Sequence, residues 1–171
     1  STGHADAPRL IYTLIGTWLA AAGASALNQY LERDIDARME RTRQRPLPDK
    51  RMSARDAGWF GLGLTLAGPV CLGVMVNWWS AGVVAATAAS YLLVYTPAKR
   101  RSSLCTVLGA IPGALPPITG WVAARGEFGP GAWVLFGILF LWQLPHTLAI
   151  ACVYRADYAR ADLRMLPVVD P

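Results

Sequence analysis

The sequence predicts an all-α, polytopic bundle of membrane-spanning helices, and two observations support this prediction. Of the 171 residues, 54% are hydrophobic and only 16% are charged, whereas a soluble domain carries about 25% charged residues. The apolar residues also fall into blocks of about 20, the length of helix that crosses the hydrocarbon core of a bilayer. We therefore expect a lipid bilayer to surround most of the chain.

Five apolar segments are predicted to form transmembrane helices. In chain order they are residues 10–31, 57–77, 79–95, 104–124 and 132–154. The third is short, with 17 residues, but it has Trp78 and Trp79 at its start and Tyr91 and Tyr95 near its end. These aromatic side chains favour membrane interfaces, so we expect a short, nearly upright helix there.

Prolines are predicted to interrupt the last two segments. Pro112, Pro116 and Pro117 fall in the fourth, and Pro145 falls in the fifth. Each proline removes a backbone donor and leaves a carbonyl that another group must satisfy in lipid. One interpretation of the fourth interruption is a packing kink between small residues, and the alternative is a functional role.

Basic residues gather in alternate connections. Residues 32–56 hold eight Lys and Arg, and residues 99–101 and 155–164 hold three each, whereas the turn at 77–78 has none and the loop 125–130 has one. This asymmetry predicts that the basic loops are cytoplasmic. The net charge of +5 then belongs to these loops and does not indicate a nucleic-acid partner.

Neither a signal peptide nor a cysteine framework is predicted. Residues 1–8 lack a basic stretch and a cleavage site, and the chain does not start with Met, so we expect it to begin inside a longer reading frame. Cys71, Cys105 and Cys152 are isolated, which argues against a zinc site or disulfides.

Polar residues at the end of the first segment suggest a metal site. If that helix continues into the loop, Asn28, Glu32 and Asp36 lie at positions i, i+4 and i+8, about 6 Å apart along one face. Their oxygens suit Mg²⁺, which is usually completed by substrate phosphates. Asp34 lies on nearly the opposite side of the helix.

Arginines follow this column of oxygen ligands in the basic loop. Arg38, Arg41, Arg43 and Arg45 are suited to grip a diphosphate through forked hydrogen bonds. Together with a metal they would form a diphosphate site. The alternative interpretation of the same residues is a solvated cytoplasmic loop.

Two further pairs of polar residues stand near the apolar segments. Tyr95 and Lys99 are four residues apart, so the ammonium would reach the same rim, or else would anchor the helix to lipid headgroups. Gln143 and His146 lie inside an apolar helix, where polar groups are costly. They would either satisfy the carbonyl freed by Pro145 or take part in a functional site.

The order of these residues resembles a known signature. Asn-x-x-x-(Asp/Glu)-x-x-x-Asp followed by Met-x-Arg-Thr-x-x-Arg-Pro-Leu, in residues 28–47, resembles the first motif of the UbiA superfamily of intramembrane prenyltransferases. Within it, residues 34–36 and 39–46 are similar to the protoheme IX farnesyltransferase (haem O synthase) family. Supporting segments are residues 95–100, 109–117, 142–146, 154–158 and 165–168. The resemblance covers the chain from residue 10 onward.

The resemblance implies both an architecture and a reaction. It implies nine helices around a central cavity, of which this chain supplies five, so residues 1–171 are expected to be one transmembrane prenyltransferase domain lacking the first helix and the last three. The implied reaction transfers farnesyl from farnesyl diphosphate to the 2-vinyl group of protoheme IX (haem b), with addition of water, giving haem O for terminal oxidase biogenesis. The implied setting is the plasma (inner) membrane, with haem A synthase or oxidase assembly factors as protein partners.

The resemblance also assigns site residues. The catalytic, metal-binding residues would be Asn28, Glu32, Asp36 and Asp157, with Mg²⁺ as cofactor. The substrate-binding residues would be Arg38, Arg41, Arg45, Tyr95, Lys99, Arg100, Gln143, His146 and Arg155. The sequence departs from the pattern in three places: Glu32 stands where Asp is usual, Val153 stands where the second Asp-x-x-x-Asp motif has its first Asp, and Asp162 replaces an expected Gly.

Other functions fit parts of the pattern. They are a related prenyltransferase acting on a quinone or chlorophyll precursor, an ion-coupled transporter that uses the acidic cluster, and a noncatalytic membrane scaffold. Release of diphosphate that depends on Mg²⁺ would separate a prenyltransferase from a transporter. A scaffold would show neither release nor transport.

Overall fold

The computed structural model describes residues 6–170, which form helices and turns without a strand. The spans are α1 (Ala7–Asp36), α2 (Ala54–Met75), a third made of α3 (Trp78–Ala89), η1 (Ser90–Tyr95) and α4 (Thr96–Arg101), a fourth made of α5 (Cys105–Ala114) and α6 (Pro116–Arg125), and α7 (Pro130–Val153). Two short helices follow, α8 (Arg155–Arg160) and α9 (Leu166–Val169). All five spans are long and apolar enough to cross a membrane. The predicted all-α class and the five predicted segments are confirmed.

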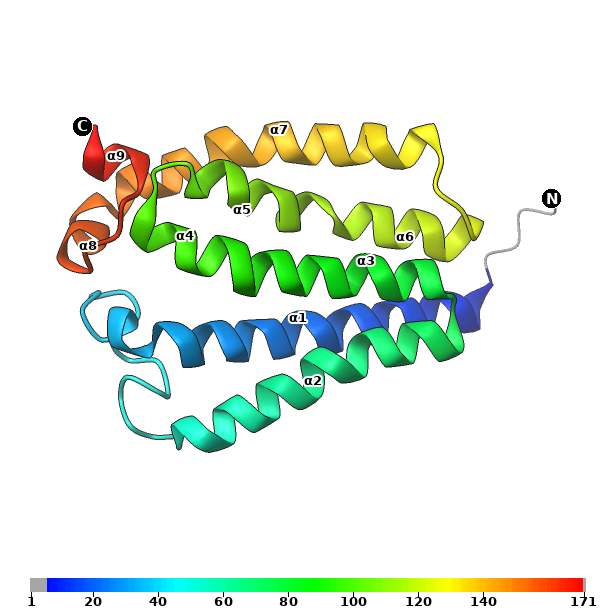
Figure 1. Ribbon diagram of the computed structural model, residues 1–171, viewed down its shortest axis with the longest axis horizontal. Coiled ribbons are helices and arrows are strands. Elements are labelled where there is room, and N and C mark those ends of the chain that lie inside the picture. Colours follow the sequence, from blue (N-terminus) through cyan, green and yellow to red (C-terminus); the bar gives the residue numbers. More distant parts are fainter. Residues whose placement is uncertain (1–5, 171) are drawn as a thin grey trace.

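Successive spans run in opposite directions, which gathers the basic connections at one end of the bundle (Figure 1). That end, here called the basic end, holds the loop between α1 and α2, helix α4, and the short helices α8 and α9. The α2–α3 turn and the α6–α7 loop lie at the opposite end. The predicted grouping of the basic connections at one end is therefore confirmed, and their cytoplasmic side stays a prediction.

Helices α1 and α2 pack with their backbones in contact. A Cβ added at Gly23 would lie 2.3 Å from the backbone nitrogen of Thr65, and one added at Gly68 would lie 2.5 Å from the carbonyl oxygen of Gly16. Only small residues permit such an approach, which is a common way for helices to associate in a membrane. This packing fixes the position of α1, the helix that carries the predicted metal ligands.

Large apolar side chains cover the outside of the bundle. Trp18, Phe60, Val74, Leu93 and Val153 are each more than 60% exposed. In water such a surface would indicate a binding patch, but in lipid it is the expected outer face. Helix α7 is the extreme case, since only two of its residues, Ala132 and Ala151, are buried.

The third span is longer than predicted. It was expected to end at Tyr95, but it continues to Arg101 and has 24 residues, so the prediction of a short helix is wrong. The π-helical turn η1 precedes Pro97. Proline already has a helical φ, and its missing N–H falls where the regular hydrogen bonding is interrupted by the π turn. The helix can therefore pass through this proline.

The prolines of the last two spans have different effects. The fourth span divides at Leu115, between α5 and α6, as predicted. Helix α7 runs through Pro145 without a break, so the predicted interruption of the fifth span is wrong. Three prolines within six residues remove three hydrogen bonds from the fourth span, whereas a lone proline removes one and fits the helical φ.

Candidate functional site

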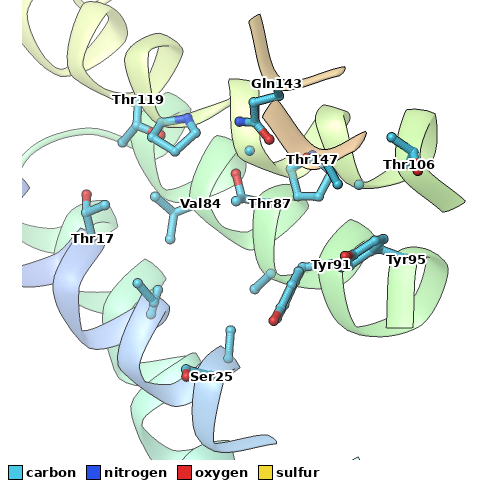
Figure 2. A pocket seen from close by; sticks show the side chains of 18 residues that line it. Thr17, Ser25, Val84, Thr87, Tyr91, Tyr95, Thr106, Thr119, Gln143 and Thr147 are labelled. Carbon is cyan, nitrogen blue, oxygen red and sulfur yellow. The ribbon is translucent and has the colours of Figure 1, made fainter. Parts of the chain in front are cut away.

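Two cavities adjoin inside the bundle. The polar cavity, of about 250 Å³, lies at the basic end, and the apolar cavity, of about 400 Å³, lies beside it. Tyr91 and Tyr95 line both cavities, and their stacked rings are 5.7 Å apart. Figure 2 shows the two rings at one side of the apolar cavity, with side chains from α1, α3 and α5 to α7 around the rest.

The polar cavity is built on the end of α1. This helix continues to Asp36, so Asn28, Glu32 and Asp36 share one face, and all three are buried and line the polar cavity. Asp34 points away, is exposed, and lies 3.4 Å from Arg100. The structure thus brings together the three residues of the predicted column and separates Asp34 from them.

A hydrogen-bonded network connects this column to the third span. Asn28 Nδ2 and Lys99 Nζ both donate to Glu32 Oε2, at 2.9 and 2.7 Å. The Thr96 hydroxyl lies 2.9 Å from Asn28 Oδ1. The second carboxylate oxygen, Glu32 Oε1, is buried and has no hydrogen-bond partner among residues 6–170. An unpaired buried oxygen is costly, so Glu32 Oε1 is an acceptor available to a cation or a donor.

The loop after α1 folds back over the polar cavity. Arg45 Nη1 donates to Asp36 Oδ2 at 2.8 Å, and the Thr42 hydroxyl donates to the Asp36 carbonyl at 2.9 Å. Arg41 also lines the cavity, and its guanidinium lies 4.7 Å from the centre of the Tyr154 ring. Two of the predicted arginines therefore face the same cavity as the oxygen column.

Asp157 holds this loop from the other side. Its carboxylate accepts hydrogen bonds from the backbone nitrogens of Glu40 and Arg41, at 3.2 and 3.4 Å, and from the guanidinium of Arg160. Burial by itself raises the pKa of Asp157, but the hydrogen bonds from Arg160, Glu40 and Arg41 outweigh it and hold the pKa below its usual value. The structure does not place Asp157 in the lining of the polar cavity.

The remaining predicted site residues are divided between the cavities and the surface. Lys99 and Tyr95 line the polar cavity, with Nζ 4.7 Å from the centre of the Tyr95 ring, and Gln143 lines the apolar cavity. His146 is exposed and stacks on Trp142, with ring centres 4.6 Å apart. The others that line neither cavity are Arg38, Arg100 and Arg155, all exposed.

Sequence reasoning missed several lining residues. Tyr91 precedes Tyr95 and Lys99 at the same four-residue spacing, so the periodicity would have identified it. Thr96 gave no such signal, because its contact with Asn28 joins residues 68 positions apart. Thr106, Thr119 and Thr147 line the apolar cavity, and isolated threonines in apolar helices carry no distinguishing pattern.

The oxygen atoms that line the polar cavity fit a divalent cation whose remaining coordination positions are filled by phosphates. Within residues 6–170, no group of three or more His, Cys, Asp and Glu side chains is arranged to hold a metal by itself. Mg²⁺, however, usually takes one or two carboxylates and leaves its other positions to water and substrate phosphates. Glu32 Oε1, free and buried, and the nearby Asp36 and Asn28 supply oxygens of this kind.

Comparison with known proteins identifies similar chains. The model of the UbiA prenyltransferase family matches residues 1–171. A protoheme IX farnesyltransferase of Solibacter usitatus is 55% identical over 166 residues, which cover 97% of this chain and 57% of the relative. Proteins of the same name from Sorangium cellulosum and Salinibacter ruber are each 48% identical, over 94% and 97% of this chain and 57% and 59% of their own lengths. The chain thus spans little more than half of the length of these relatives, and no solved structure matches it.

Proposed function

This chain belongs to the UbiA prenyltransferase family, and we propose that it transfers a farnesyl group from farnesyl diphosphate to the 2-vinyl group of protoheme IX (haem b). Water is added in the same reaction, and the product is haem O for terminal oxidases. The observation that carries the proposal is the junction of a polar and an apolar cavity at Tyr91 and Tyr95. A prenyl diphosphate has the same two parts, a charged head and a hydrocarbon tail. The names of the relatives support the choice of substrates.

The polar cavity is the proposed site of the diphosphate. Three positively charged residues line it, Lys99, Arg41 and Arg45. They would form charge-assisted hydrogen bonds with the diphosphate. Asn28, Glu32 and Asp36 would hold Mg²⁺, which neutralises the charge that develops on a leaving diphosphate. In the structure described, Glu32 and Asp36 are paired with Lys99 and Arg45, two of the cations that would bind the diphosphate.

The apolar cavity is the proposed site of the farnesyl chain. Small side chains such as Ala20, Ala24 and Ala88 line it, and none of its lining residues is charged. Such a pocket keeps bulk water away from the farnesyl chain, which protects an allylic cation from premature capture. The rings of Tyr91 and Tyr95 line both cavities. The first carbon of the farnesyl chain, which joins the tail to the diphosphate, would therefore lie beside these rings.

The wider setting is proposed on the same basis. Five apolar spans and the family place the chain among multi-pass membrane proteins. We propose the plasma membrane, with the basic end in the cytoplasm, and haem A synthase or oxidase assembly factors as partners. We also propose that residues 1–171 form one domain to which further helices of the family's bundle belong.

The product of the reaction tests the function. Full-length protein in detergent is incubated with Mg²⁺, prenyl diphosphates of several lengths and haem b, and the pigments are identified by mass spectrometry. Farnesylated haem is the expected product. A product formed only with a quinone or chlorophyll precursor would replace the proposed acceptor, and ion movement without diphosphate release would indicate a transporter.

A further inference from the structure

A row of uncharged polar side chains lines one wall of the apolar cavity. Thr106, Thr119, Gln143 and Thr147 come from α5, α6 and α7, and Figure 2 shows them along the same side of the cavity. Thr106 and Thr119 are only 5% and 1% exposed. Their hydroxyl oxygens have no hydrogen-bond partner within residues 6–170. Two buried hydroxyls without a hydrogen-bond partner are costly in an apolar cavity. This indicates that a ligand supplies the missing hydrogen bonds.

The break between α5 and α6 adds backbone acceptors to this wall. Pro116 and Pro117 have no N–H, so the carbonyls of Pro112 and Gly113 lose their regular helical donors. The amide of Gln143 lies directly against this break, because a Cβ added at Gly113 would be 2.1 Å from Gln143 Nε2. Hydroxyl, amide and carbonyl groups therefore gather in the part of the cavity that α5, α6 and α7 form.

The ligand of this wall must form hydrogen bonds and carry no charge. A farnesyl chain has no group that donates or accepts a hydrogen bond, so it would leave Thr106 and Thr119 unpaired. A charged ligand would lack a counter-ion, since no charged residue lines the apolar cavity. Water both donates and accepts, and a buried water typically makes about three hydrogen bonds to groups of this kind.

We propose that Thr119 and Gln143 hold an ordered water molecule in the apolar cavity, and that this is the water added during farnesyl transfer. This inference rests on the proposed function. The outer vinyl carbon bonds to farnesyl as the diphosphate leaves, which moves positive charge to the inner vinyl carbon. The held water forms the carbon–oxygen bond there, and its proton passes to the released diphosphate. Without that water, the inner carbon's cation loses a proton and gives an unhydrated alkene.

The test compares hydrated with unhydrated product. The full-length Gln143→Leu and Thr119→Val variants are incubated with farnesyl diphosphate and haem b in water labelled with heavy oxygen. Each variant is expected to lower the ratio of hydrated to unhydrated product about five-fold, the factor that corresponds to the loss of one neutral hydrogen bond. Thr119→Ser, which keeps the hydroxyl, should restore the ratio. Thr65→Val is the matched control, because its hydroxyl donates to the Gly61 carbonyl outside both cavities.

The outcomes separate this inference from the proposed function. If the unchanged protein makes no farnesylated haem, the proposed function fails. If it does, and Gln143→Leu and Thr119→Val slow the reaction without changing the product ratio, the held water is excluded. If the apolar variants do not fold, Thr119→Ser and Gln143→Asn are compared instead. Thr119→Ser should give the same product ratio as the unchanged protein, whereas Gln143→Asn, with its shorter side chain, should lower the ratio. An unlabelled hydroxyl in the product would also overturn the inference.

Discussion

Lys99 Nζ lies 2.7 Å from Glu32 Oε2, although the two residues are 67 positions apart in the chain. Both side chains are largely buried, 13% and 8% exposed. The contact joins α1 to the end of the third span at the floor of the polar cavity. It therefore contributes both to the packing of the basic end and to the charge of the proposed diphosphate site.

Lys99→Met should destabilise the protein because it leaves Glu32 charged and unpaired. Breaking one partner of a buried ion pair costs about 3–5 kcal/mol, and the loss is measured as a lower thermal midpoint of helical circular dichroism in detergent. Lys99→Met combined with Glu32→Gln removes both charges and should recover most of the stability. Arg100→Met is the control, since its pair with Asp34 is exposed and worth no more than about 1 kcal/mol. Equal losses for the Lys99 and Arg100 variants would contradict the buried pair.

Asp36→Ala should lower the rate of farnesyl transfer far more than Asp34→Ala in the full-length protein. Asp36 is buried in the polar cavity, whereas Asp34 is exposed on the other side of α1. Loss of one electrostatic contact to a developing charge commonly costs about 10²- to 10³-fold. Rates are compared at saturating Mg²⁺ with protein levels matched, and Glu32→Asp, which keeps the carboxylate, should be mild. Equal losses at Asp34 and Asp36 would mean that the site is built on another face.

Asp157→Ala should release the loop that follows α1. The Asp157 carboxylate accepts hydrogen bonds from the backbone of Glu40 and Arg41, and their loss frees the backbone of the loop to enter the active site of trypsin. Cleavage after Arg41 and Arg43 is expected to be about ten-fold faster, as for the loss of hydrogen bonds to a charged group. Asp162→Asn is the control, because Asp162 is exposed and Asn tolerates its positive φ. Unchanged cleavage in Asp157→Ala would show that other contacts hold the loop.

The same contact predicts a pH dependence. The pKa of Asp157 is lowered in the folded protein. The stability that its carboxylate gives to the loop after α1 is therefore fully present above the pKa of the unfolded chain, about 3.9 for an Asp. It is lost only as the pH falls through the lower folded value. Protection of the loop from an acid-stable protease should therefore persist below pH 4 and then disappear. Loss of protection between about pH 6 and 5 would assign the transition to a different group.

Composition and helical periodicity predicted the spans and the column Asn28, Glu32 and Asp36, because both depend on local sequence. The partners of that column could not be predicted in this way. Thr96 and Lys99 reach it only through the packing of the third span against α1, and Asp157 meets Glu40 across 117 residues. Such contacts depend on tertiary arrangement, which periodicity does not encode. The passage of α7 through Pro145 likewise depends on how a whole span tolerates one missing bond.

A cysteine placed at Gln44 tests the orientation of the basic end. The residue lies in the loop between α1 and α2 and is exposed, and the Lys and Arg asymmetry predicts that this loop faces the cytoplasm. An impermeant thiol reagent should label it in inverted vesicles and not in intact cells. A variant with Cys71, Cys105 and Cys152 changed to Ser or Ala supplies the background, and labelling from the outside of intact cells would reverse the orientation.

Gly23→Ala should displace α1 from α2 and so disturb the polar cavity at a distance. The added Cβ would lie 2.3 Å from the backbone nitrogen of Thr65 and 2.7 Å from the Gly61 carbonyl oxygen, and neither atom belongs to a side chain that can rotate away. Overpacking of this kind typically costs about 1–3 kcal/mol. Since Asn28 and Glu32 continue the same helix, the shift should also weaken their contacts with Thr96 and Lys99.

The matched control for that variant is Gly63→Ala on α2. A Cβ at Gly63 meets nothing within 4 Å, and alanine in an open helical position is favoured over glycine by roughly 0.5–1 kcal/mol. The two substitutions are chemically identical and should have opposite signs, so the difference in thermal midpoint isolates the contact between α1 and α2. A second measurement, the loss of stability on adding Lys99→Met, should be smaller in the Gly23→Ala background, because the ion pair is already stretched there. If Lys99→Met costs the same in both backgrounds, α1 has not moved at the polar cavity, and the glycine contact supports the bundle without positioning the site.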